Sequence, residues 1–140
     1  MQNKTFAPNP DKVGKNWIHM DATDKVLGKL STDIVKALMG KNKPEFAPNE
    51  NIGDKVVVTN SAKVATTGTK MKKKMYYHHT GFPGGLRTES LENLMKRDST
   101  EVIRKAVKGM LPKNKLQKER LANLYIYKGA EHPHKAQIKN

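Results

Sequence analysis

The stretch KVVVTN, residues 55–60, decides the fold class of this chain. Consecutive valines are typical of a β-strand that is buried on both faces, and such strands occur mainly in parallel sheets. Upstream, the segment WIHMDA (17–22) alternates apolar and polar residues and predicts another strand. Between the two strands, apolar residues recur at helical spacing and Gly40 is placed to end a helix: Leu27, Leu30, Ile34, Val35 and Leu38. Strand, helix and strand form a βαβ unit, which predicts an α/β fold with helices over a central sheet.

The remaining elements are read outward from this unit. Residues 1–15 carry little apolar periodicity and are expected to form an extended arm, with one domain over 16–140. Short strands are expected over 63–66 and over 75–79, and a turn-rich loop over 80–85 follows the second. Helical periodicity resumes near Ser90, and Asp98 with Glu101 forms a capping-box pattern that opens a helix ending at Pro112. That helix is expected to bury Val102, Ile103, Ala106, Val107 and Met110, and a short basic helix over 114–122 and a last strand over 125–129 follow.

Composition excludes several classes of protein. A chain of 140 residues is enough for one domain with a core of its own, and it contains no cysteine, which removes disulfides and thiolate chemistry. No apolar run approaches the ~18 residues of a membrane span, and the N-terminus lacks a signal-peptide pattern. We therefore expect a soluble, unexported protein that does not act at a membrane.

The charge is large and unevenly placed. Lys and Arg number 27 against 13 Asp and Glu, a net charge of +14. No acidic residue occurs over 55–88 or over 102–118, and only four of the 27 bases are arginine. Such segregation of charge predicts a polyanion as the partner. Lysine neutralises phosphate groups but, unlike arginine, does not form the paired hydrogen bonds that recognise a nucleobase. The excess of lysine over arginine therefore favours structured RNA, which proteins recognise through its backbone and shape.

The segment KKKMYYHHTGFPGG, residues 72–85, is the main candidate site. His78 and His79 would point to opposite faces of a strand, which disfavours a shared metal, and His132 with His134 is a weak metal signal. No carboxylate lies between Asp54 and Glu89, the stretch that holds His78 and His79, and Glu131 alone does not complete a metal site at His132 and His134. The glycines match no nucleotide-binding fingerprint. A histidine-dependent nuclease and a DNA-binding architectural protein stay open as alternatives. The preferred interpretation is an RNA clamp in which lysines neutralise phosphates and glycines let the main chain approach, ordered only when RNA binds.

Five motifs carry a resemblance to a known family. They are WIHMDATDKVLGKLST (17–32), GDKVVVTNSAKVATTGTK (53–70), YYHHTGFPGGL (76–86), KGMLPKNKL (108–116) and EHPHKAQ (131–137). In order and spacing they resemble the family of bacterial large-subunit ribosomal protein thirteen. The resemblance implies a three-layer α/β/α domain with a four-stranded, mainly parallel sheet of order 3-2-1-4, plus extended basic loops and tails. It also implies a cytoplasmic structural constituent of the large ribosomal subunit that binds 23S rRNA, joins early in assembly, contacts neighbouring ribosomal proteins, and has no enzymatic activity, cofactor, metal or small-molecule substrate.

The family's RNA-facing motifs fall on residues of this sequence one by one. The resemblance implies RNA contacts at Lys72, Lys73, Tyr76, His78, His79, Thr80, Gly81, Gly84, Gly85, Lys108, Gly109, Met110, Leu111, Pro112, Lys113, His132 and His134. The expected rRNA-binding set contains all of these except Met110, Leu111 and Pro112. It also contains further basic residues of the same segments: Lys70, Lys74, Arg87, Arg104, Lys105, Lys115, Lys118 and Arg120. The chain departs from the family's usual pattern at Phe82, where tyrosine is common, at Lys29 and Ser31 in the first helix, and at Gln117, where a glycine turn is expected.

Overall fold

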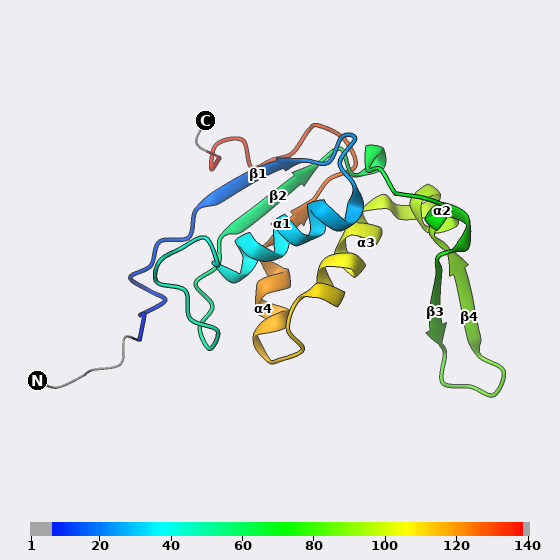
Figure 1. The fold of residues 1–140 in the computed structure, drawn as a ribbon, viewed down its shortest axis with the longest axis horizontal. Helices are drawn as coiled ribbons and strands as arrows, with labels where there is room; N and C mark the ends of the chain where they lie inside the picture. The colour runs from blue at the N-terminus through cyan, green and yellow to red at the C-terminus, as the bar shows by residue number, and fades with distance from the viewer. Residues whose placement is uncertain (1–6, 139–140) are drawn as a thin grey trace, which may run out of the picture.

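A parallel sheet of three strands organises the molecule. The computed structural model describes residues 7–138. Strands β1 (Trp17–Asp21), β2 (Lys55–Thr59) and β5 (Leu124–Ile126) run parallel in the order β1-β2-β5 (Figure 1). Val56, Val57 and Val58 of the central strand are fully buried. The prediction of a buried parallel strand after a βαβ crossover is confirmed.

The helices lie on one face of this sheet. Helix α1 (Leu27–Met39) links β1 to β2, while α3 (Leu91–Met110) and α4 (Leu116–Ala122) lie on the path from β2 to β5. Both crossovers step across the sheet in the same direction, so right-handed connections place all three helices on the same side. Their apolar residues form one core with the inward side chains of the strands. As expected, Gly40 ends α1 in the left-handed conformation, with φ of 75°.

The opposite face of the sheet is covered by the C-terminal segment. His134 stacks on Trp17 of β1 with ring centroids 4.9 Å apart, and His132 stacks on His19 at 5.6 Å. Figure 1 shows this segment, in orange and red, running along the side of the sheet away from the helices. The expected α/β/α layering, with helices on both faces of the sheet, is therefore not observed, because a non-helical chain segment forms the third layer.

The strand order also differs from the expected 3-2-1-4 sheet of four strands. Strands β3 (Met75–His79) and β4 (Leu86–Ser90) pair antiparallel with each other and form a separate two-stranded sheet. The strand expected over 63–66 appears only as an isolated parallel bridge between Val26 and Ala65. The short helices η1 (Ser61–Lys63) and α2 (Lys70–Lys73) complete this connection. The β3–β4 hairpin projects from the body of the protein (Figure 1).

Helix α3 contains a kink at the predicted N-cap. Asp98 has non-helical torsion angles (φ −152°, ψ 98°), and its Oδ1 accepts hydrogen bonds from the backbone N–H and the hydroxyl of Thr100 at 2.9 and 2.7 Å. Glu101 does not complete the expected capping box, because its carboxylate pairs with Arg97 and Lys105 instead. The helix buries Val102, Ile103 and Val107 as predicted, whereas Ala106 is only half-buried. Met110 is 46% exposed because it lies on the last turn, beyond the sheet.

A buried ion pair anchors the loop before β1. Lys43 Nζ lies 2.6 Å from Asp54 Oδ1 and also donates to the carbonyl oxygens of Gly14 and Ile52. Asp54 Oδ1 accepts from the backbone N–H of Asn16 in turn. These contacts join residues 14–16 to the loop that leads into β2. The predicted arm of residues 1–15 is described only from residue 7, and its first six residues lie outside the described chain.

Candidate nucleic-acid interface

The β3–β4 hairpin separates its side chains onto two faces. Tyr76 and His78 alternate with Tyr77 and His79 along β3, as a strand requires. Tyr76 is half-buried, and the ammonium groups of Lys105 and Lys74 lie 5.0 and 5.5 Å from its ring centroid. Burial raises the pKa of the Tyr76 hydroxyl. Tyr77 is 69% exposed, so one tyrosine contacts the body and its neighbour faces solvent, as predicted.

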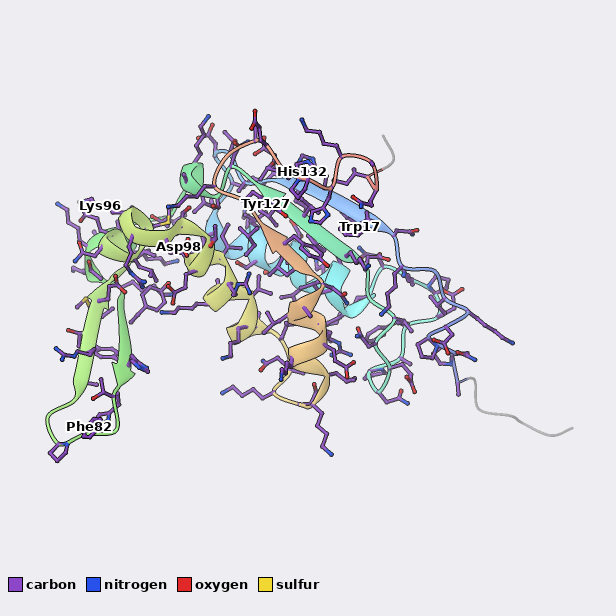
Figure 2. All side chains as sticks on the ribbon, turned by 180° about the vertical axis from the view of Figure 1, so that it is seen from behind. Trp17, Phe82, Lys96, Asp98, Tyr127 and His132 are labelled. Carbon is purple, nitrogen blue, oxygen red and sulfur yellow. The ribbon has the colours of Figure 1, made fainter. Side chains whose placement is uncertain are left out.

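The turn of the hairpin is held by its own backbone. The N–H of Thr80 donates to the Gly85 carbonyl at 3.0 Å, and the N–H of Gly85 donates to the Phe82 carbonyl at 2.9 Å. His79 Nδ1 accepts from the N–H of Gly81, so the ring of His79 is fixed to the turn. Gly81 and Gly84 have φ of 87° and 67°, a region that favours glycine. Phe82, at the tip, is 74% exposed (Figure 2).

Gly85 is required for a different reason. A Cβ at this position would overlap the Thr80 hydroxyl and come within 2.8 Å of the Phe82 carbonyl. The glycine therefore closes the turn by close approach of the chain to itself. Gly81 and Gly84 have open space around their Cα atoms within the described chain, which leaves their main chain accessible.

The lysines at the base of the hairpin are exposed. Lys70, Lys72 and Lys73 lie in α2 and Lys74 follows it, and none of α2 is buried. None of the ion pairs among residues 7–138 involves these four lysines. An uncompensated cluster of four ammonium groups is suited to a polyanion. Arg87 on β4 is also exposed and adds to the same hairpin.

A second basic surface follows the end of α3. Arg104 is exposed, whereas Lys105 is half-buried and paired with Glu101 at 3.0 Å. Beyond them, the exposed expected residues are Lys108, Gly109, Lys113, Lys115 and Lys118. Gln117 stands where a glycine turn was expected. It lies within α4, where its side-chain amide donates to the carbonyls of Lys108 and Leu111 at 3.0 and 3.3 Å and so holds α4 against the end of α3.

Comparison with known proteins gives a direct match. The family model described as "Ribosomal protein L13" matches residues 15–133. The chain belongs to the ribosomal protein L13 family. Proteins named large ribosomal subunit protein uL13 are 50% identical in Legionella pneumophila (strain Corby) and 51% identical in Chromohalobacter salexigens, each over 134 residues. These matches cover 96% of this chain and 93% and 94% of the two relatives. The resemblance noted from the motifs is confirmed, and membership of a ribosomal protein family confirms that the chain is not an enzyme.

One expected RNA-binding residue of this L13-family chain is in the core instead. Arg120 is fully buried, and its Nη2 donates to the carbonyls of Pro48 and Glu50 at 3.2 and 3.1 Å. Burial lowers the pKa of the guanidinium. Arg120 therefore ties α4 to the loop before β2 and is not available at the surface. The sequence pattern missed this because a charged residue in a basic helix normally faces solvent.

The two expected tail histidines lie far from the hairpin. Figure 2 labels His132 beside the parallel sheet, at the top of the view, and Phe82 at the tip of the hairpin, at the lower left. His132 and His134 pack among Trp17, Tyr125 and Tyr127, so both are half-buried and act in packing. Burial lowers the pKa of His132, with His19, Lys135 and His134 adding to the effect. The structure therefore separates them from the other expected contacts.

Residues 7–138 contain neither a cluster of metal-binding side chains nor a membrane-spanning helix. In that part of the chain, no three His, Cys, Asp or Glu side chains gather where a metal could bind. None of its ion pairs includes a histidine, so no carboxylate is paired with His78, His79 or His134 there. No helix within the described residues is long and apolar enough to cross a membrane.

Proposed function

We propose that this chain is a structural constituent of the large ribosomal subunit that binds 23S rRNA. Its L13-family relatives are named as proteins of the large ribosomal subunit. The observation that supports rRNA binding most strongly is the projecting β3–β4 hairpin with four lysines at its base, 70 and 72–74, that form no ion pair with any residue of 7–138. A hairpin that reaches away from the core can enter a folded RNA while the sheet remains intact.

The proposed interface has two parts. The first is the hairpin with Lys70, Lys72, Lys73, Lys74 and Arg87, where the open main chain of Gly81 and Gly84 allows RNA backbone to approach. The second is the exposed set after α3, namely Arg104, Lys108, Lys113, Lys115 and Lys118. Both surfaces belong to the proposed RNA-binding domain of residues 16–140. Protein-free 23S rRNA should be sufficient for binding, which suits a protein that joins early in subunit assembly and afterwards contacts neighbouring ribosomal proteins.

The test is binding to purified 23S rRNA over a salt series, with bulk duplex RNA and duplex DNA as competitors. Replacing Lys72, Lys73 and Lys74 with alanine should lower the slope of log K against log salt by about 2–3, because each neutralised phosphate contributes about 0.7–0.9. The matched control replaces Lys12, Lys15 and Lys41, three exposed lysines of the N-terminal side, by alanine. Equal losses from both triple variants, or no preference for 23S rRNA over duplex competitors, would contradict the proposal.

A further inference from the structure

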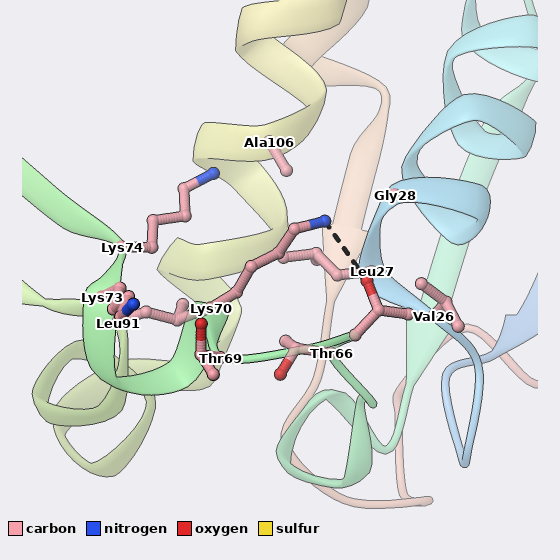
Figure 3. A pocket seen from close by; sticks show the side chains of 11 residues that line it. Val26, Leu27, Gly28, Thr66, Thr69, Lys70, Lys73, Lys74, Leu91 and Ala106 are labelled. Atoms are coloured by element: carbon pink, nitrogen blue, oxygen red, sulfur yellow. Dashed lines mark hydrogen bonds between the residues drawn. The ribbon is translucent and has the colours of Figure 1, made fainter.

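A pocket lies between the base of the hairpin and the two long helices. It has a volume of about 540 Å³ and is bordered by the start of α1, the loop 66–69, α2 and α3. Figure 3 shows it from close by. Neither composition nor periodicity indicated this pocket, because four segments far apart in the sequence build it.

The lining of the pocket has two chemistries. Its apolar part comes from Leu27, Leu91 and Ala106, and the first two are at least nine-tenths buried. The rim carries hydroxyls of the loop 66–69 and the side chains of Lys70, Lys73 and Lys74, and no acidic residue lines the pocket. Lys70 Nζ donates to Thr67 Oγ1 at 3.3 Å, which holds that lysine across the opening (Figure 3). A ligand that enters the pocket therefore meets an apolar floor and, at the rim, three lysine ammonium groups.

The first turn of α1 adds backbone donors to the same wall. Gly28 lines the pocket, and a Cβ there would meet no atom of the described chain within 4 Å. The N-cap position is Val26, which has no side-chain acceptor, and the first turn contains no acidic residue. The N–H of Leu27 donates to the Ala65 carbonyl, whereas those of Gly28 and Lys29 have no backbone acceptor among residues 7–138. The positive end of the helix thus reinforces the charge of the lysines.

We propose that this pocket takes one unstacked nucleotide of RNA, with its base on the apolar floor and its phosphates at Lys70, Lys73 and Lys74. The inference rests on the proposed rRNA-binding function and specifies how it is achieved at this surface. A phosphate alone would not need the floor of Leu27, Leu91 and Ala106, and an apolar ligand would not need three ammonium groups. Structured RNA offers both chemistries at once, because proteins bind it through bases that leave the helical stack. A volume of 540 Å³ lies within the range of about 300–1,000 Å³ usual for small-ligand pockets.

The decisive variant is Ala106→Leu, which fills the pocket from α3 without changing the charge. Its matched control is Ala122→Leu, which adds the same side chain at an exposed position of α4. The ligands are a single-stranded hexaribonucleotide, the same hexamer with one abasic ribose at its centre, and a free nucleoside monophosphate. Amide chemical shifts of Gly28 and Ala106 report occupation of the pocket, and affinity for 23S rRNA is measured in parallel.

The hexamer should shift the Gly28 and Ala106 resonances, and the abasic hexamer should bind about tenfold more weakly. Ala106→Leu should abolish these shifts and weaken 23S rRNA binding about tenfold with an unchanged salt slope, while Ala122→Leu has no effect. Lys70→Met provides a second variant outside the core, and it should weaken hexamer binding and lower the salt slope by about one. This variant keeps the test valid if the larger side chain at position 106 prevents folding.

Two results would overturn the inference while leaving rRNA binding intact. One is equal binding of the intact and abasic hexamers, with normal 23S affinity of Ala106→Leu. The other is saturation of the pocket by the free nucleotide at concentrations where the hexamer does not enter, which would make a mononucleotide the ligand. Loss of all specific binding to 23S rRNA by the unmodified, folded protein would instead overturn the proposed function itself.

Discussion

At the scale of single residues, the pair of Lys43 and Asp54 is the clearest test of what stabilises the fold. The two side chains are 13% and 7% exposed, and Asp54 also accepts from the N–H of Asn16. Replacing Asp54 by alanine leaves an ammonium group buried without its partner, and we expect a loss of about 3 kcal/mol in the free energy of unfolding. Urea denaturation followed by circular dichroism measures this change.

The matched control for that pair is Asp33 with Lys36. These side chains are 63% and 53% exposed, and the closest N–O distance is 3.9 Å. Asp33→Ala should change the free energy of unfolding by less than about 0.5 kcal/mol, because solvent screens exposed pairs. Similar losses in both variants would show that the contacts of Lys43 do not anchor the loop.

His132 should make the cover of the sheet sensitive to pH. Burial lowers the pKa of His132 below the usual 6.5, so the unfolded segment binds a proton more readily than the packed one. The packing is therefore fully stable above about pH 6.5 and weakens as the pH falls below that value. The titratable or charged groups facing the ring are His19, His134 and Lys135, and their electrostatic repulsion disfavours a proton on His132.

Trp17, the only tryptophan, reports this change because it stacks on His134. Its fluorescence should change between pH 7.5 and 5 in the unmodified protein. In His132→Phe the ring stacking is retained but the titration at this position is removed, so the change should be smaller. An identical pH profile in both proteins would exclude His132 as the source.

At the scale of elements, the kink of α3 gives a prediction of its own. Asp98 caps the second half of the helix through Thr100, and these hydrogen bonds lower the pKa of its carboxyl. Asp98→Ala should cost about 1 kcal/mol of stability, whereas Asp98→Asn keeps an acceptor and should cost less. Thermal unfolding of the two variants distinguishes them, and an equal effect would argue against capping.

The hairpin should be the least protected element in the free protein. Its strands are exposed along most of their length, in contrast to β2, whose three valines are fully buried. Amide exchange over 75–90 should be much faster than exchange at Val56 and Val58, and 23S rRNA should slow it. Protection of the hairpin equal to that of β2 without RNA would defeat the expectation that this segment is ordered by binding.

The helices and strands with a strong periodic pattern of apolar residues were predictable from the sequence, and those with a weak pattern were not. Helix α1 and strand β2 each have a continuous buried face, so the pattern of apolar residues in their sequences predicts which side chains are buried. Strand β4 was missed because both faces of LRTES are mostly exposed, and no apolar alternation specifies such a strand. Its pairing with β3 depends on the turn over 80–85, which was predicted only as a loop.

At the scale of the whole molecule, the charge pattern predicted an exposed basic surface, whereas the expected strand order differs from the observed sheet. Segregated lysines are visible in the sequence and remain exposed in the fold, as Lys72 and Lys73 show. The position of Arg120 and the pocket beside Ala106 depend on contacts between distant segments, which local patterns do not encode. The strand order likewise depends on non-local pairing, and the order 3-2-1-4 that the resemblance implies differs from the observed order β1-β2-β5.

The cover of the sheet by residues 128–138 has a consequence for how the chain is made. Translation proceeds from the N-terminus, so β5 and the two packing histidines emerge from the ribosome after α1, β1 and β2. Until then, one edge of β2 has no partner and the outer side of Val57 has no covering layer. A nascent chain halted before Leu124 should therefore hold α1, β1 and β2 only loosely, and the fold can be completed only after residues 124–138 have been made.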